Sequence, residues 1–163
     1  MLLVAVGDGL TPRTAALFAF RTQWSCVAID PLMAEADSWS GKVDRLRAVR
    51  ARVQDAGTFD AAKVLLVLPH AHVELAACLR QVSWRDALAA IVIPCCNWYK
   101  AAAGCAAPCH EAEDLGIVSP HRLVRVWRWT RDDQCLPCDV PPAEPLIDVG
   151  GNDSAAEACA AAC

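Results

Sequence analysis

The sequence predicts an α/β fold in which a mostly parallel sheet is flanked by helices, and two observations carry that prediction. Short apolar runs without helical spacing recur at residues 2–6, 26–29, 64–68 and 90–93. Each run is followed by a glycine, an aspartate or a proline, residues that end strands. The intervening segments contain apolar residues at helical spacing, and such alternation of strand and helix is typical of parallel sheets.

The first run predicts a buried strand followed by a tight turn, because Gly7-Asp8-Gly9 comes directly after it. Thr11-Pro12 then predicts the start of a helix, since threonine is a good N-cap and proline is favoured at the first helical position. We expect four apolar residues to form the buried side of this helix: Ala15, Leu17, Phe18 and Phe20.

The second run predicts a strand that ends at Asp30-Pro31. Residues 42–56 are ambiguous, because their apolar positions fit both a helical stripe and a strand that alternates with arginines. We favour a short helix that leads into a strand at about residues 49–54, since a parallel sheet needs a strand at this point of the chain.

The rest of the body predicts three strands and one helix. A buried strand over 64–68 ends at Pro69, a helix covers 73–88, and a further buried strand over 90–93 ends at Pro94. We expect the inward side of the helix to consist of Leu75, Ala76, Leu79, Val82 and Trp84. After Pro94 the only convincing strand is the alternating segment 123–129, which fits an antiparallel position near a sheet edge.

Length and charge divide the chain into a domain over residues 1–131 and an acidic tail over 132–163 that is rich in proline, alanine and cysteine. The 163 residues suit one domain. Residues 1–131 contain 15 basic and 12 acidic residues and are net +3, whereas the tail has seven acidic residues and no basic one. No apolar stretch is long enough for a membrane span, and the start lacks the basic region of a secretory signal. We therefore expect a cytoplasmic protein without a membrane partner.

The ten cysteines are expected to be thiols or metal ligands, because a reducing compartment disfavours disulfides. Cys105-x3-Cys109-His110 and Cys135-x2-Cys138 offer a four-ligand zinc set, and His70, His72, Cys95 and Cys96 offer a mixed set. The first pair is loosely spaced, and the alanine-rich context indicates cysteines that are not placed for pairing. We therefore predict no metal site.

Together, the glycine turn, the capped helix, Val27-Ala28-Ile29-Asp30 and the strands that end at Pro69 and Pro94 resemble the class I S-adenosylmethionine-dependent methyltransferases over about residues 1–100. This resemblance implies a minimal, Rossmann-like version of the methyltransferase fold. It also implies that Gly7, Asp8 and Gly9 lie under the methionine part of S-adenosylmethionine and that Asp30 holds the ribose hydroxyls. Gly9 and Asp30 are 21 positions apart, close to the roughly 20 expected for such an acid.

The sequence departs from this family at three points. Pro12 stands where a third glycine is expected, and Leu68-Pro69-His70-Ala71-His72 replaces the Asn-Pro-Pro-aromatic motif of amino-methylating members. The family also closes its sheet with two strands after the fifth, whereas one is evident here. Three functions therefore stay open: a methyltransferase of unknown acceptor, a catalytically inactive methyltransferase-like binding or assembly module, and another nucleotide-cofactor enzyme.

Ligands of open α/β sheets bind at the carboxyl ends of the strands, and this rule selects the remaining candidate residues. We expect Asp55 to contribute to the cofactor site, and His70 and Cys95 to be catalytic, with His70 as general base. Simpler roles compete with these: Asp8 as acceptor of turn amides, Asp30 as a cap, His70 as a helix cap and Cys95 as a small apolar residue.

A nucleic acid and a protein are both candidates for the methyl acceptor. The oligomeric state is not predicted. Arginines cluster at residues 45–52 and 122–131, where the second cluster alternates with Trp127 and Trp129. Such a pattern could bind phosphates and stack on bases. A solvated basic face is the alternative, and the overall net charge of −4 argues against strong nonspecific binding to nucleic acid.

Overall fold

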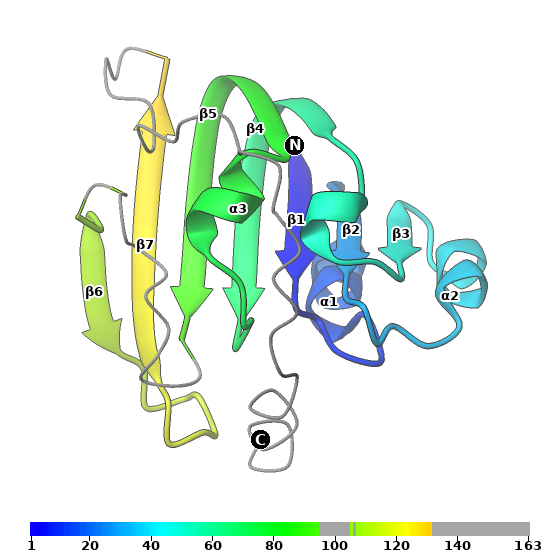
Figure 1. The fold of residues 1–163 in the computed structure, drawn as a ribbon, viewed down its shortest axis with the longest axis horizontal. Helices are drawn as coiled ribbons and strands as arrows, with labels where there is room; N and C mark the ends of the chain where they lie inside the picture. Colours follow the sequence, from blue (N-terminus) through cyan, green and yellow to red (C-terminus); the bar gives the residue numbers. More distant parts are fainter. Residues whose placement is uncertain (95–104, 106, 132–163) are drawn as a thin grey trace, which may run out of the picture.

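The computed structural model describes residues 1–94, 105 and 107–131. Its elements are β1 (Leu2–Val6), α1 (Arg13–Arg21), β2 (Ser25–Ile29), α2 (Ala36–Lys42), β3 (Leu46–Val49), η1 (Val53–Asp55), β4 (Phe59–Pro69), α3 (Leu75–Leu79), β5 (Val82–Ile93), β6 (His110–Glu113) and β7 (Leu123–Thr130). The strands form one seven-stranded sheet in the order β3-β2-β1-β4-β5-β7-β6 (Figure 1).

Five of the strands are parallel, which confirms the predicted sheet. β1 lies between β2 and β4, with Val4 opposite both Val27 and Leu66. β3 extends the sheet beyond β2, and β5 extends it beyond β4. Only β7 runs antiparallel to its neighbours β5 and β6. The order of the strands reverses between β1 and β4, where an open α/β sheet forms its ligand crevice.

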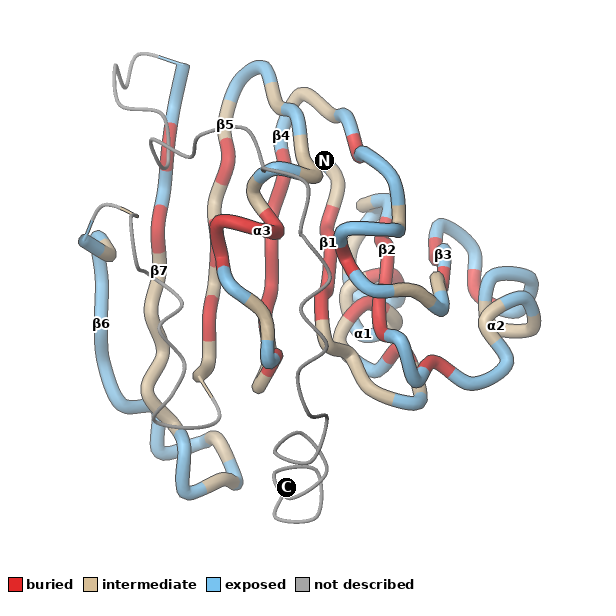
Figure 2. Tube along the Cα trace, in the orientation of Figure 1, coloured by how far each residue is buried: buried red, intermediate tan, exposed pale blue. Residues whose placement is uncertain are grey.

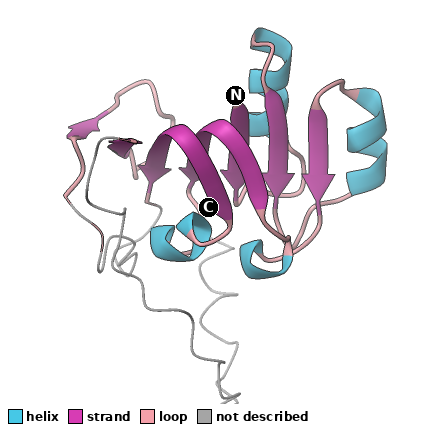
Figure 3. Cartoon of the chain, turned by 90° about the horizontal axis from the view of Figure 1, so that it is seen from above, coloured by secondary structure: helices cyan, strands magenta, loops and turns pink. Residues whose placement is uncertain are grey.

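The core lies on both faces of this sheet, because successive side chains of a strand point to opposite faces. On one face, α1 and α2 pack over β1, β2 and β3. On the other, α3 and η1 pack over a cluster that includes Leu66, Leu88 and Trp127. Figure 3 shows the helices on the two sides, and Figure 2 shows continuous buried stretches in β1 and β4, whereas buried and intermediate residues alternate along β5.

The predicted start and buried side of the first helix are partly wrong. Pro12, not Thr11, is the N-cap of α1, and no side chain of the cap residue binds the helix. Ala15 and Ala19 form the buried side, whereas Leu17 and Phe20 are 55% and 72% exposed. Alanines face the sheet because they let the helix approach the strands closely.

The third strand lies earlier than predicted. β3 covers Leu46–Val49, a 3-10 turn occupies Val53–Asp55, and the preceding helix is α2. Leu46 and Ala48 are buried on the helix side of the sheet, which fixes the strand register. The arginines at 50 and 52 follow the strand rather than alternate within it.

The helix predicted over 73–88 is wrong in its second half. α3 covers only Leu75–Leu79, and β5 begins at Val82. β5 pairs with β4 from Phe59 opposite Val82 to Pro69 opposite Ile93, so pairing along the long strand β4 draws residues 82–88 into the sheet. Strand pairing therefore overrides the helical spacing of residues 82–88, which contain no glycine or proline that would have ended a helix.

Two strands follow β5, as the methyltransferase resemblance implies and as the residue pattern alone did not predict. β7 confirms the expected strand at 123–129, and β6 adds His110–Glu113. All four residues of β6 are exposed, so it carries no alternation of apolar and polar residues. Pairing with β7, supported by an ion pair between Arg125 and Glu111, is what makes it a strand.

The cysteines differ in state. Cys26, Cys78 and Cys109 are free, whereas Cys105 is disulfide-bonded, so the prediction that all ten are thiols or metal ligands is wrong for Cys105. Burial raises the pKa of the Cys78 thiol to about 12, and it packs as an apolar residue in the core.

No described helix is long and apolar enough to cross a membrane. The acidic tail lies outside the described residues.

Candidate active site

Candidate residues from three strands meet at one edge of the sheet. Gly7 follows β1, Asp30 follows β2 and His70 follows β4, and these parallel strands end at the same edge (Figure 1). The backbone continues the pairing one residue past the strands: the Gly7 amide donates to the Ile29 oxygen at 2.9 Å, and the His70 amide donates to the Ile93 oxygen at 2.9 Å. The topology therefore brings these residues together as the sequence predicts.

The glycine turn after β1 has the backbone conformation that favours glycine. Gly7 and Gly9 have φ angles of 77° and 80°, in the left-handed region. A Cβ atom at Gly9 would meet nothing within 4 Å, so its backbone faces open space. A backbone surface without side chains lets a ligand approach closely.

Asp30 joins this turn to the end of β2. Its Oδ2 accepts a hydrogen bond from the Gly9 amide at 2.9 Å, and its Oδ1 accepts one from the Leu32 amide at 2.7 Å. Asp30 is 8% exposed and is the one charged residue that the described core buries. Backbone amides fix the carboxylate, and since a carboxylate offers about four acceptor positions, both oxygens can accept further hydroxyl donors.

Asp8 lies in the same turn but serves α1. Its two carboxylate oxygens accept hydrogen bonds from the Thr14 and Ala15 amides at 2.8 and 3.0 Å. These are amides of the first helical turn, which have no partner within the helix. Asp8 thus caps α1 from outside the helix, in place of Thr11, and its role in cofactor binding stays a prediction.

Gly7 explains a close approach that the sequence did not reveal. A Cβ atom at Gly7 would lie 2.7 Å from the Ala71 Cβ and 3.0 Å from the Ala71 Cα. The turn after β1 therefore packs directly against the turn after β4. Ala71 is a functional candidate that the sequence analysis missed, because a small buried residue in an alanine-rich chain gives no signal.

His70 begins the turn between β4 and α3 and has a left-handed backbone, φ 54°. Such a conformation is uncommon for a residue other than glycine and is often found at functional sites. Burial lowers the pKa of His70, and repulsion from His121 lowers it further. Glu74, not His70, is the N-cap residue of α3.

Two further predicted site residues are Asp55 and Cys95. Asp55 is exposed at the end of η1, and its amide donates to the Arg52 oxygen at 3.0 Å. Its place in the cofactor site stays a prediction. Cys95 and its neighbours Cys96, Asn97, Trp98 and Tyr99 lie outside the described residues.

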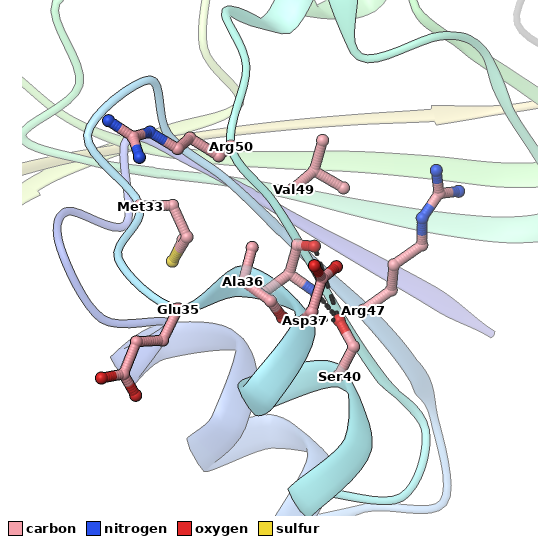
Figure 4. Close-up of a pocket in the computed structure, with 9 residues that line it drawn as sticks. Met33, Glu35, Ala36, Asp37, Ser40, Arg47, Val49 and Arg50 are labelled. Carbon is pink, nitrogen blue, oxygen red and sulfur yellow. Dashed lines mark hydrogen bonds between the residues drawn. The ribbon is translucent and has the colours of Figure 1, made fainter.

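A polar pocket lies next to the Asp30 turn, between α2 and the end of β3. Figure 4 shows its lining residues, with Asp37 and Ser40 at the centre and the guanidinium groups of Arg47 and Arg50 pointing away from each other. The Ser40 hydroxyl is already engaged, since it accepts a hydrogen bond from the Ala48 amide at 2.9 Å. The charged groups do not converge, so this pocket is not the site that the glycine turn and Asp30 form.

Two other functions considered from the sequence were base stacking by tryptophans and metal binding. Trp127 and Trp129 are 2% and 6% exposed, so the prediction that they stack on nucleic-acid bases is wrong. They pack in the core opposite Ala90 and Leu88 of β5. Among the described residues, no group of three or more histidine, cysteine, aspartate or glutamate side chains is placed to hold a metal ion.

No protein-family description and no curated protein matches this sequence. Solved structures do align with it. A 16S rRNA (adenine(1408)-N(1))-methyltransferase W203A mutant from Catenulisporales acidiphilia is 17% identical, covers 79% of this chain and 84% of its own, and has a TM-score of 0.49.

Two further solved structures align over similar lengths. An RNA methyltransferase from Salinibacter ruber in complex with S-adenosyl-L-homocysteine is 16% identical, with 88% and 84% of the two chains covered and a TM-score of 0.45. The antibiotic-resistance methyltransferase Kmr is 17% identical, with 78% and 84% covered and a TM-score of 0.45. Each of these three solved proteins is described as a methyltransferase.

Proposed function

We propose that this chain binds S-adenosylmethionine at the edge formed by Gly7, Gly9 and Asp30 and acts as a methyltransferase. The observation that carries the proposal is the hydrogen bond between the Gly9 amide and the buried Asp30 carboxylate. It combines, in one place, a backbone surface open to a ligand and a fixed acceptor for hydroxyl groups. These two features suit S-adenosylmethionine, because its ribose has hydroxyl groups and its methionine part must lie close to the backbone.

The residues suit the parts of such a cofactor. Asp30 would accept the ribose hydroxyls, and the turn at Gly7 and Gly9 would lie against the methionine part. When bound, S-adenosylmethionine supplies an electrophilic methyl group. The rest of the chemistry falls to the protein, which must place the acceptor and take its proton.

His70 is the proposed proton acceptor. Its lowered pKa keeps the imidazole neutral at neutral pH, the form that can accept a proton. Its position after β4 puts it at the same sheet edge as the glycine turn, since Gly7 contacts the next residue, Ala71. Cys95, which follows Pro94 in the sequence and lies outside the described residues, remains a second proposed catalytic residue.

We propose a nucleic acid as the acceptor rather than a protein, because a cluster of exposed arginines offers contacts to phosphates. Recognition would depend on arginines, since Trp127 and Trp129 are buried. Arg47 in β3 and Arg50 and Arg52 after it are exposed. They would contact phosphates without reading the bases.

Titration calorimetry of the purified chain with S-adenosylmethionine and S-adenosylhomocysteine tests the cofactor. We expect binding, and we expect Asp30→Ala to weaken it by about 1.5 to 3 kcal/mol, the contribution of a hydrogen bond to a charged group. Asp37→Ala is the matched control, because Asp37 is an exposed acid on the neighbouring helix α2.

Each outcome of this titration separates the functions. Binding that Asp30→Ala weakens and Asp37→Ala leaves unchanged supports the proposal. No heat at millimolar cofactor would refute cofactor binding and favour the inactive binding module. Heat with NADH but not with S-adenosylmethionine would favour another nucleotide-cofactor enzyme.

A further inference from the structure

On the side of α1, the described helices cover only one part of the sheet. On this side α1 and α2 pack over β1, β2 and β3, and no described helix packs over β5 or β7. Figure 3 shows the two helices over one end of the sheet only. We define the open face by Lys63, Ala87, Ala89, Ile91, Val126 and Arg128.

The strand registers place these residues side by side. Lys63 of β4 lies opposite Ala87 of β5, and Ala89 and Ile91 lie opposite Arg128 and Val126 of β7. Lys63 shares its face with Leu65, which packs in the cluster under α1, so the open face continues the α1 side of the sheet.

Burial differs sharply between the two faces of β5. Leu88, Ala90 and Val92, which point to the α3 side, are 2%, 0% and 0% exposed. Ala87, Ala89 and Ile91, which point to the open face, are only half-buried. Ala89 and Ile91 touch the edge of the cluster under α1, but no described helix covers them, whereas a strand inside an α/β sheet is normally covered on both faces.

The open face has small side chains, a shallow recess and two basic residues. A recess lined by Cys109, His110, Val126, Arg128 and Thr130 lies where β6 meets β7. Lys63 and Arg128 are both exposed at the border of the alanines. An apolar segment that carries acidic residues would complement this surface.

The chain supplies such a segment directly after β7. Arg131 follows the strand, and its amide donates to the Asp86 oxygen at 3.3 Å, so the last described residue of this segment lies beside the start of the open face. Residues 132–163 have seven acidic residues, no basic one and an alanine-rich end. A stretch of 32 residues can span roughly 100 Å when extended, far more than the face requires.

The end of this segment fits the shape of the face. Ser154 and Glu157 have the spacing of a capping box ahead of the alanine and cysteine run 155–163, which favours a short helix. Alanine side chains would let that helix lie close to Ala87 and Ala89. A helix of this length is marginal alone, so packing on the sheet would stabilise it.

We propose that residues 132–163 dock on the open face, with the run 155–163 over Ala87, Ala89 and Ile91 and with tail carboxylates near Lys63 and Arg128. The segment would supply the missing layer of the α1 side. This inference is independent of whether the chain binds a cofactor, because the open face lies away from the carboxyl edge of the sheet.

Hydroxyl-radical footprinting of the full chain, read by mass spectrometry, tests this proposal. We compare the wild type with Lys63→Glu/Arg128→Glu and with the matched control Arg13→Glu/Arg21→Glu, which makes the same charge change on α1. We expect labelling of Ile91 and Val126 to rise several-fold in the first variant only. Leu17, exposed on α1, should be labelled equally in all three proteins.

A second variant guards against misfolding of the sheet. Replacing Asp132, Asp133, Asp139 and Asp148 by asparagine leaves the described domain unchanged and should also raise the labelling of Ile91 and Val126. Equal labelling of these residues in every protein would overturn the proposal. Protection that grows with protein concentration, together with a dimer in sedimentation, would overturn it in favour of a second copy.

Discussion

The Gly9 amide donates a hydrogen bond to Oδ2 of Asp30 at 2.9 Å, across 21 positions of the sequence. This bond couples the turn after β1 to the end of β2. A carboxylate held in this way would not need to reorganise when a ribose arrives, so it would bind hydroxyl groups at little entropic cost. The same bond also gives Asp30 a structural role. Its structural role should affect the free energy of unfolding, and its binding role should affect the affinity for the cofactor.

Loss of the Asp30 carboxylate should destabilise the fold as well as weaken binding. Asp30→Ala leaves the Gly9 and Leu32 amides without their acceptor, so we expect unfolding free energy to fall by about 1 to 3 kcal/mol. Asp30→Asn keeps one acceptor oxygen and should lose less. Urea unfolding of both variants measures the effect, and unchanged midpoints would show that these two hydrogen bonds do not stabilise the turn.

Gly7→Ala should be more harmful than Gly9→Ala. Both residues have positive φ, so either substitution should cost about 1 kcal/mol in backbone strain. Gly7→Ala adds a contact of 2.7 Å with the Ala71 Cβ, for which overpacking predicts about 1 to 3 kcal/mol more.

A double variant isolates this contact. Ala71→Gly in the Gly7→Ala background removes the Cβ that is struck and should recover part of the lost stability. Thermal unfolding of the three variants and the wild type provides the comparison. If Gly7→Ala and Gly9→Ala were equally stable, the turn after β4 would not restrict the glycine turn.

Sequence patterns predicted the parallel half of the sheet well, because β1 and β2 are buried on both faces and end at glycine or aspartate. They failed where pairing decides the structure. β6 has four exposed residues and exists through its hydrogen bonds to β7. Residues 82–88 join the sheet because β4 is long enough to pair with them.

The sequence likewise predicted part of the candidate site. Gly7, Gly9, Asp30 and His70 lie at one edge because strand topology dictates it, and topology followed from the alternation of strands and helices. The capping of α1 by Asp8 and the contact between Gly7 and Ala71 depend on three-dimensional geometry. No spacing rule connects Asp8 to Thr14 or Gly7 to Ala71.

Asp8→Ala should destabilise α1, because two amides of its first turn lose their acceptor. We expect a loss of about 0.5 to 2 kcal/mol, the range for removing an N-cap side chain. Thr11→Ala is the control and should have little effect, since the Thr11 hydroxyl accepts an exposed hydrogen bond from the Arg13 side chain at 3.3 Å and not from a helix amide. Chemical unfolding monitored by circular dichroism measures both, and a larger loss in Thr11→Ala would contradict the assignment.

The pH dependence of stability should reveal His70. Its pKa is lowered from 6.5 in the folded state, by burial first and by His121 second. The unfolded state therefore binds the proton more tightly, and the stabilisation is present above pH 6.5 and lost as the pH falls below it. His70→Asn should remove this part of the dependence, and asparagine tolerates the left-handed backbone. His121→Gln should raise the pKa of His70, which titration of the His70 ring by NMR would follow.

The same histidine carries the proposed chemistry, so activity and stability must be measured on the same variants. If His70 is the general base, His70→Asn should reduce turnover by about 10² to 10⁴-fold and leave the affinity for S-adenosylmethionine nearly unchanged. His72→Ala should reduce it less, because His72 is exposed two positions further along. The acidic limb of the rate profile should move to higher pH in His121→Gln, since the repulsion that lowers the pKa is gone. A loss of stability in His70→Asn without a loss of turnover would remove His70 from the mechanism and leave it as a residue of the turn between β4 and α3.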